Sequence, residues 1–160
     1  MKISVITVCW NCVNQIRETI RSVIGQDYLD LEYIIIDGNS TDGTKNIIEE
    51  YRSEISQYNS EPDLGIYDAM NKGISLASGK WTLFLNAGDL FYNDKVISNI
   101  FNNIESSKDC HVIFGSTIMK YSFGTYIVTP GNPEMLTKRM PFCHQSVFFR
   151  TSILKKNRII

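Results

Sequence analysis

The chain has 160 residues and a mass of 18.3 kDa, a size that suits one domain able to bury a substantial core. Apolar residues make up 43% of the sequence and charged residues 21%, with only 4 Pro and 10 Gly, which excludes collagen-like, low-complexity and disordered chains. The formal net charge of −1 leaves no basic excess for neutralising phosphates, so we expect no nucleic-acid partner.

Charge is distributed unevenly along the chain. All 17 acidic residues lie at or before Glu134, whereas six of the 16 basic residues follow it. This asymmetry indicates either a basic surface for an anionic ligand or a membrane, or a chain that ends before its compensating acids. Both interpretations stay open at this point.

Neither a membrane span nor a disulfide framework is indicated. No apolar run approaches the length of about 18 residues that a spanning helix needs. Ser4 and Thr7 interrupt the apolar residues 3–10, which favours a buried strand over a signal peptide. Four cysteines in a chain that can bury its own core indicate a reducing environment. We expect a cytoplasmic protein, with the inner face of a membrane as the alternative location.

The first part of the chain has the pattern of a βαβ unit. Residues 3–8 and 31–36 are short β-branched runs that predict buried strands. Between them, apolar residues recur at helical spacing over residues 16–24, with Asn11 or Asn14 as the expected N-cap. A strand, a helix and a strand in this space predict parallel pairing.

The later elements continue this alternation and then change. Periodicity predicts further helices over residues 44–55, 67–77 and 96–104, strands over 81–85 and 112–114, and a hairpin of 117–121 with 125–128. We therefore predict a doubly wound α/β fold with a mostly parallel central sheet and a mixed C-terminal part. It should form one domain over residues 1–160.

Polar segments follow three of the predicted strands. In parallel sheets ligands bind outside the carboxyl ends of the strands, so these segments should share one crevice. Asp37 directly follows a buried strand, and we assign it mainly to ligand binding, whereas Asp42 is assigned mainly to capping the next helix. The first turn lacks a G-x-G-x-x-G pattern, which argues against a nicotinamide or flavin dehydrogenase.

Two further clusters contain residues suited to phosphate and metal chemistry. Asp89 follows the strand at 81–85, where one carboxylate can hold Mg²⁺ or Mn²⁺ together with substrate phosphate oxygens. Asp68, Asn71 and Lys72 share one helical face. This face is either a solvated ion pair or, near a helix N-terminus, a contact for a diphosphate.

The motifs occur in a fixed order along the chain: residues 4–8 with Asn11, then 36–44, 65–73, 85–89, and finally His144 with Gln145. In this order they resemble the family-two glycosyltransferases of the GT-A fold, from residue 2 to residue 154. The resemblance implies a Rossmann-like three-layer sandwich. It also implies an inverting transferase that moves a sugar from a nucleotide-diphosphate sugar, usually UDP-linked, to a saccharide or lipid-linked acceptor in bacterial surface-polysaccharide synthesis.

The resemblance also implies roles for individual residues. The donor site would be lined by Thr7, Asn11, Asp37, Asp68, Lys72 and Asn86. Asp37 would bind the base, and Asp68 and Lys72 would lie beside the ribose and diphosphate. Asp89 would hold the divalent metal, Mg²⁺ or Mn²⁺. His144 and Gln145 would lie on the acceptor and diphosphate side, and His144 is considered both as a catalytic group and as a structural histidine.

The sequence departs from the family pattern at two places. Asn86 and Gly88 stand where carboxylates can occur, which leaves Asp89 alone as an acidic metal ligand. Inverting transfer also needs a carboxylate base, which in the family follows the His-Gln motif, yet no acid follows Glu134. We expect either a truncated transferase or a nucleotide-sugar-binding fragment without turnover.

The cysteines suggest two rival functions. Cys9 and Cys12 have the C-x-x-C spacing of a thiol oxidoreductase between a strand and a helix. A zinc site is the other alternative, although its spacings match no standard module. Its ligands would come from Cys9, Cys12, Cys110, His111, Cys143 and His144. A membrane surface and a second copy of the chain are left open as further partners.

Overall fold

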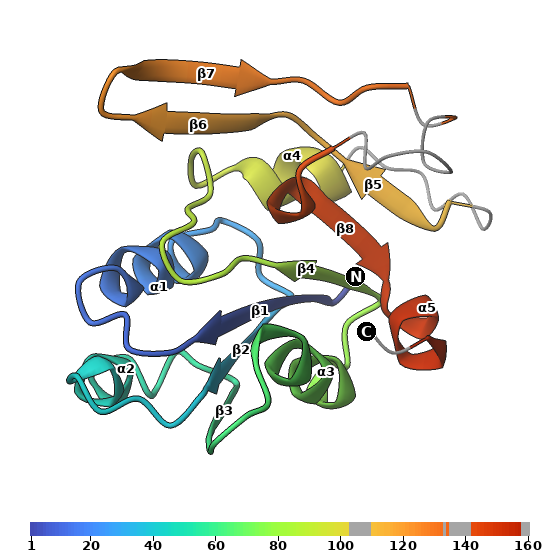
Figure 1. Ribbon diagram of the computed structural model, residues 1–160. Helices are drawn as coiled ribbons and strands as arrows, with labels where there is room; N and C mark the ends of the chain where they lie inside the picture. The colour runs from blue at the N-terminus through green and yellow to red at the C-terminus, as the bar shows by residue number, and fades with distance from the viewer. Residues whose placement is uncertain (103–109, 133, 135–141, 158–160) are drawn as a thin grey trace.

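The computed structural model describes residues 1–102, 110–132, 134 and 142–157 (Figure 1). Within these residues the main sheet has six strands in the order β3-β2-β1-β4-β8-β5, and β6 and β7 form a separate two-stranded sheet. The strands are β1 (Ile3–Cys9), β2 (Leu31–Asp37), β3 (Gln57–Ser60), β4 (Trp81–Phe84), β5 (Val112–Phe114), β6 (Thr117–Tyr121), β7 (Gly124–Val128) and β8 (Val147–Arg150). The described helices are α1 (Ile16–Ile24), α2 (Thr44–Glu50), α3 (Ile66–Leu76), α4 (Val96–Phe101), α5 (Thr151–Lys156) and the 3₁₀ turn η2 (His144–Ser146).

The main sheet is parallel in its first part and mixed in its last part, as predicted. β1 pairs in parallel with β2 and β4, and β2 pairs in parallel with β3. β8 runs antiparallel to both β4 and β5. The chain winds outward from β1 to β3 and then returns to place β4 on the other side of β1. This reversal beside β1 is the point at which open α/β sheets bind their ligands.

Helices cover both faces of the sheet, which confirms the predicted three-layer sandwich (Figure 1). Alternate side chains of β1 point to opposite faces. Ile3 and Val5 belong to the core beneath α1, α2 and α4, whereas Ile6 and Val8 belong to the core beneath α3 and α5. Fully burying each such aliphatic side chain stabilises the fold by about 1.5–3 kcal/mol.

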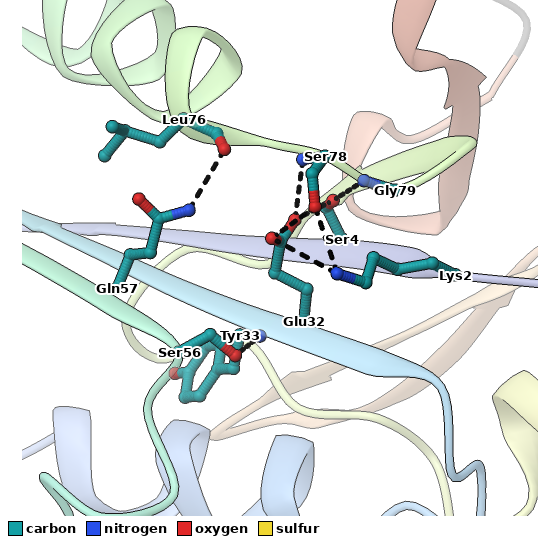
Figure 2. A network of polar contacts seen from close by, with 9 residues as sticks. All are labelled: Lys2, Ser4, Glu32, Tyr33, Ser56, Gln57, Leu76, Ser78 and Gly79. Carbon is teal, nitrogen blue, oxygen red and sulfur yellow. Dashed lines mark hydrogen bonds and ion pairs between the residues drawn. The ribbon is translucent and has the colours of Figure 1, made fainter.

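A buried carboxylate joins the amino ends of the parallel strands (Figure 2). Glu32 in β2 is 6% exposed. It accepts hydrogen bonds from the Ser4 hydroxyl at 2.6 Å, the Ser78 amide at 2.7 Å and the Ser78 hydroxyl at 2.6 Å. Burial opposes ionisation, but these hydrogen bonds and the charge of Lys2 outweigh it and lower the pKa of Glu32. Glu32 thus ties β1 and β2 to the turn that precedes β4.

The segment after α2 differs from the expected long helix. α2 ends at Glu50 and is followed by turns, so the predicted end at Ile55 is wrong. Ile55 is 4% exposed and leads into β3, which the sequence pattern did not indicate. β3 consists of polar and aromatic residues, and such a strand is tolerated because, within the described ranges, it lies at the edge of the sheet and pairs with β2 alone.

The N-terminus of α1 also differs from the expectation. Its N-cap is Gln15, without a side-chain capping hydrogen bond, so the predicted caps Asn11 and Asn14 are wrong. Asn11 instead has a φ of 48°, a left-handed conformation that asparagine tolerates better than most residues. Its amide and side chain are used by the neighbouring loop, as described below.

The last part of the chain combines expected and unexpected elements. β4, β5 and the β6–β7 hairpin occur where the sequence predicts them, to within one residue. α4 covers the start of the expected helix at 96–104, and residues 103–104 lie outside the described residues. β8 and α5 were not predicted. Among the described residues, no helix combines the length and the apolar character that crossing a bilayer requires.

Candidate functional site

At the carboxyl edge of the sheet the loops after β1 and β2 are hydrogen-bonded to each other, and the loop after β4 is hydrogen-bonded to the end of β1. The Asn11 amide after β1 donates to the Ser40 hydroxyl after β2 at 2.7 Å. The Thr41 amide donates back to Asn11 Oδ1 at 2.8 Å. The Ala87 amide after β4 donates to the Val8 carbonyl at 3.3 Å. The polar segments that the sequence places after β1, β2 and β4 therefore form one connected surface.

Asp37 at the end of β2 is a buried organiser of this surface. Its side chain is 0% exposed. Oδ2 accepts from the Ser40 amide at 3.0 Å and the Ser60 hydroxyl at 2.6 Å, while Oδ1 accepts from the Ser40 hydroxyl and from Cys9 Sγ at 3.7 Å. The structure therefore places this predicted base-binding residue inside the protein, where it holds the β2–α2 turn against β3. Direct contact of Asp37 with a base stays a prediction.

Thr7 lies under the site and does not reach its surface. It is 0% exposed in β1, and its hydroxyl donates to the Leu85 carbonyl at 2.8 Å. The same hydroxyl lies 3.0 Å from the hydroxyl of Tyr33. Burial raises the pKa of Tyr33, although the contact with Thr7 opposes this effect. Thr7 thus supports the chain that leads from β4 into the site, and its predicted contact with the nucleotide stays a prediction.

Asp42 has the capping role that the sequence predicts. Its Oδ1 accepts from the amide and hydroxyl of Thr44, the first residue of α2, at 3.0 and 2.6 Å. Oδ2 accepts from the Val13 amide at 2.9 Å, which fastens the start of α2 to the loop after β1. The hydrogen bond with the Thr44 side chain is the main reason that the pKa of Asp42 is lowered.

Asp68 and Lys72 pair with each other and with the loop that precedes α3. The Lys72 ammonium lies 3.1 Å from Asp68 Oδ2 and 3.0 Å from Glu61 Oε1, and it donates to the Pro62 carbonyl at 3.0 Å. The bond to Glu61, followed by that to Asp68, raises the pKa of Lys72. Both residues line a cleft of about 440 Å³ between α3 and α5, together with Lys155. Their predicted role beside ribose and diphosphate stays a prediction.

Asp89, His144 and Gln145 come together beside the switch point. η2, which contains His144 and Gln145, packs against β4, and Asp89 lies in the loop that follows β4. Desolvation raises the pKa of Asp89, while the charge of His144 and a hydrogen bond from the Gln145 side chain act against it. Two motifs that are far apart in the sequence thus form one cluster, in which Asp89 and Gln145 are half-buried and His144 is exposed.

Gly88 is required by the shape of the loop that presents Asp89. Its φ is 98°, a conformation that favours glycine. A Cβ there would also lie 3.3 Å from Gln15 Oε1. The Gly88 amide donates to the Thr19 hydroxyl at 2.9 Å, and that hydroxyl donates to the Asp89 carbonyl at 3.0 Å. α1 thereby fixes the loop, and the loop geometry explains why no acidic residue occupies position 88.

The residues around Asp89 fit a hard divalent cation. Oδ1 of Asn86, in the same loop, is buried and accepts no hydrogen bond within the described part of the chain. A carboxylate held in a desolvated place and an unsatisfied amide oxygen are donors that Mg²⁺ or Mn²⁺ accepts, with phosphate oxygens completing the shell. In the described ranges no three His, Cys, Asp or Glu side chains are grouped to hold a metal, so the alternative zinc site is not assembled.

Trp10 and Asp63 also belong to this edge, although the sequence analysis did not single them out. The Trp10 side chain is 68% exposed directly after β1. The Trp10 indole and the Asp63 carboxylate both lie close to Gly38. A Cβ added at Gly38 would be 2.6 Å from Asp63 Oδ2 and 3.3 Å from Trp10 Cδ1, so the absence of a side chain at Gly38 leaves room for both groups. Asp63 Oδ1 accepts from the Gly65 amide at 2.8 Å, which orients the carboxylate. A tryptophan directly after a buried strand was the available sequence signal.

The cysteine pair at the end of β1 does not have the properties of a thioredoxin-type site. Cys9 is 7% exposed, and a hydrogen bond with Cys12, burial and the nearby Asp37 charge raise the pKa of its thiol. The hydrogen bond from Cys9 lowers the pKa of Cys12. Both cysteines are free thiols. A thiol oxidoreductase would need a reactive thiolate at the first cysteine, which this environment disfavours.

Comparisons with known proteins agree with this arrangement of fold and motifs. The chain is 29% identical over 153 residues to a PGL/p-HBAD biosynthesis glycosyltransferase of Mycobacterium bovis, with 94% of this chain and 59% of that protein covered. It is similar in fold to S. aureus TarS in complex with UDP, at a TM-score of 0.73 and 24% identity over 98% of this chain and 49% of TarS.

A second solved structure shares the fold. It is the mannosyltransferase PcManGT from Pyrobaculum calidifontis in complex with GDP-Man and Mn²⁺, at a TM-score of 0.73 and 18% identity over 97% of this chain and 46% of that chain. The chain thus spans 59% of the length of the curated relative from M. bovis. The family model Glycosyl transferase family 2 matches residues 4–155, and the chain therefore belongs to this family.

Proposed function

We propose that this chain binds a nucleotide-diphosphate sugar at the carboxyl edge of its sheet and acts in an inverting glycosyltransferase. The acceptor would be a saccharide or a lipid-linked saccharide in the synthesis of a bacterial surface polysaccharide, on the cytoplasmic side. The observation that carries the proposal is the convergence of Asp89, His144 and Gln145 beside the switch point of a family-two fold. A site that joins a carboxylate to cationic and amide groups suits a metal-bound diphosphate.

Asp89 would hold the metal in this site, with Asn86 Oδ1 as a further oxygen ligand. Bound Mg²⁺ or Mn²⁺ would supply positive charge to the departing nucleoside diphosphate. Asp89 is suited to this role because burial disfavours its charge in the absence of a cation. Gln145 would orient the carboxylate through its hydrogen bond.

His144 would act on the reacting groups themselves. It is exposed at the start of η2 and near enough to Asp89 to affect its pKa. In an inverting transfer the acceptor oxygen bonds to the anomeric carbon while the bond from that carbon to the diphosphate breaks, and the proton of the acceptor hydroxyl passes to a general base. An imidazole N–H beside the diphosphate would donate a hydrogen bond to the leaving oxygen and stabilise the charge that develops there. His144 is therefore our candidate catalytic residue.

Trp10 and Asp63 would recognise the base, with Asp37 fixing the turn that contains Gly38. The exposed indole offers a stacking surface. The Asp63 carboxylate offers only acceptor oxygens, so it would favour a base with an N–H at ring position 3, as in uracil, over cytosine, whose N3 is an acceptor. We propose uridine diphosphate as the nucleotide; the structure of TarS in complex with UDP supports this choice, whereas PcManGT is in complex with GDP-Man.

The metal assignment is tested by calorimetry on the purified 160-residue chain. We expect UDP to bind more tightly with Mn²⁺ than without it, and Asp89→Asn to abolish that difference. Asp27→Asn, an exposed carboxylate change elsewhere on the surface, is the matched control and should leave the difference intact. Equal strengthening by Mn²⁺ in Asp89→Asn and the unchanged chain would show that the metal assignment is wrong.

The base assignment is tested with a nucleotide panel. Trp10→Ala should weaken binding of every nucleoside diphosphate by about tenfold, because stacking depends little on base identity. Asp63→Asn should reduce the preference for UDP over CDP by about tenfold, since an amide can also donate to cytosine N3. An unchanged UDP to CDP ratio in Asp63→Asn would remove this residue from base recognition.

A nucleotide-sugar-binding unit without turnover is the second candidate function, and it would share the donor site described above. The two functions are distinguished by measuring the release of UDP from UDP-sugar in the presence of saccharide acceptors, for the unchanged chain and for His144→Ala. Tight binding without any release would support the binding unit.

A further inference from the structure

The β6–β7 hairpin is separate from the rest of the sheet structure. Its two strands pair only with each other, and neither joins the six-stranded sheet in the described part of the chain. Figure 1 shows the hairpin lying along one end of the molecule, outside α4 and β5, with its turn at the end far from β5. A two-stranded ribbon is marginally stable alone in water, so a further contact would stabilise it.

Apolar side chains are exposed on both faces of this hairpin. Ile118 and Ile127 are direct partners on one face and are 36% and 68% exposed. Tyr121 and Tyr126 lie on the other face at 51% and 52% exposure, and Phe123 in the turn is 75% exposed. The three aromatic rings contact one another at centroid distances of 5.1, 5.9 and 6.2 Å, which makes the tip a preformed aromatic cluster.

Charge on the hairpin has one sign. Residues 110–132 contain no Asp or Glu, although the chain has 17 acidic residues in total. Lys120, opposite Thr125, is the single Lys or Arg in this segment and is exposed. A surface that combines tyrosines, an exposed phenylalanine, aliphatic residues and one lysine without carboxylates has the composition of a membrane-interface element.

We infer that the β6–β7 hairpin inserts its tip into the headgroup region of an anionic bilayer. A protein or saccharide partner with a flat surface would cover one face of the ribbon, whereas a lipid interface surrounds both. The unpaired strand edges limit the depth, because amide and carbonyl groups without partners are tolerated among hydrated headgroups but not in the hydrocarbon core. The inference does not depend on the proposed donor chemistry, since membrane contact needs no nucleotide.

Vesicle flotation of the 160-residue chain without nucleotide tests this inference. We expect the chain to float with vesicles of phosphatidylcholine and phosphatidylglycerol and to float less with phosphatidylcholine alone. The double variant Phe123→Ser with Ile127→Ser should bind at least about tenfold more weakly, since two exposed apolar groups lose their contact with lipid. Leu29→Ser is the matched control, because Leu29 is also an exposed apolar residue, at 102%, but lies before β2 and outside the hairpin.

Lys120→Gln separates the electrostatic part of the contact. It should weaken binding to the anionic vesicles by about fivefold and leave binding to neutral vesicles unchanged. Circular dichroism and thermal melting confirm that the variants are folded, which is expected since the changed side chains are exposed. Equal flotation of the double variant and Leu29→Ser, or no flotation of the unchanged chain, would overturn the inference. Self-association that the double variant abolishes, without vesicle binding, would assign the hairpin to a second copy of the chain instead.

Discussion

Removing the charge of Glu32 should destabilise the fold at the amino ends of its strands. Glu32 accepts three hydrogen bonds from Ser4 and Ser78, and each is a bond to an ionised acceptor. In Glu32→Gln the amide keeps one acceptor oxygen and turns an N–H₂ group toward at least one donor. Charged hydrogen bonds contribute about 1.5–3 kcal/mol and neutral ones about 1 kcal/mol. Because the variant also recovers some desolvation free energy, we expect a net loss of about 2–3 kcal/mol.

Thermal and denaturant unfolding measure this loss. At about 2–4 °C per kcal/mol for a chain of this length, the melting temperature should fall by roughly 4–12 °C. Glu18→Gln is the control, since Glu18 is 66% exposed and lies 3.8 Å from Arg21, and it should change stability by less than about 0.5 kcal/mol.

The stability contribution of Glu32 should depend on pH in a defined direction. The pKa of Glu32 is lower in the folded state than its usual value of about 4.3. Its ionised form therefore stabilises the fold above that pH, and this contribution disappears as the pH falls through the lower folded-state pKa. The difference in stability between the unchanged chain and Glu32→Gln should be constant near neutral pH and should shrink on acidification. A difference that does not shrink, or a loss no larger than that of Glu18→Gln, would refute the reasoning.

Two further predictions concern packing and cysteine reactivity. Gly73→Val should destabilise the fold by about 1–3 kcal/mol, because a Cβ at Gly73 would lie 2.5 Å from Ile6 Cγ2, whereas Gly115→Ala should be nearly neutral since no atom lies within 4 Å of its Cβ position. Equal melting temperatures of the two variants would contradict this packing. In timed alkylation followed by mass spectrometry, Cys12 should react well before Cys9, because burial and a raised pKa protect the Cys9 thiol. Faster modification of Cys9 would restore the oxidoreductase alternative.

Local patterns predicted the central architecture because they depend on neighbouring residues in the sequence. β-Branched runs identified β1 and β2, and a helical period identified α1 between them. The polar strand β3 could not be identified in this way, since its residues are stabilised by pairing with β2 rather than by their own pattern. β8 was missed for a related reason: four residues are too short to distinguish a strand from a turn without knowledge of β4 and β5 beside it.

The candidate site shows the same division between local and tertiary information. Capping by Asp42 was predictable, because its partner Thr44 is two residues away. The burial of Asp37 was not, since it depends on Ser60 and Cys9 in neighbouring strands. The cluster of Asp89 with its two partners in η2 was anticipated only through the family resemblance. Convergence of side chains from different loops requires the fold itself.

The position of β8 has a consequence for how the chain reaches its folded state. β4 pairs with β1 on one side and with β8 on the other, and the β8 register runs from Trp81 with Arg150 to Leu83 with Phe148. During synthesis the ribosome therefore completes β4 well before β8 exists, by about 3–13 seconds at ordinary rates of elongation. Throughout that time the emerging protein exposes an apolar strand edge open to pairing with other chains. The nascent chain should thus depend on a chaperone for this interval, until β8 emerges and pairs with β4.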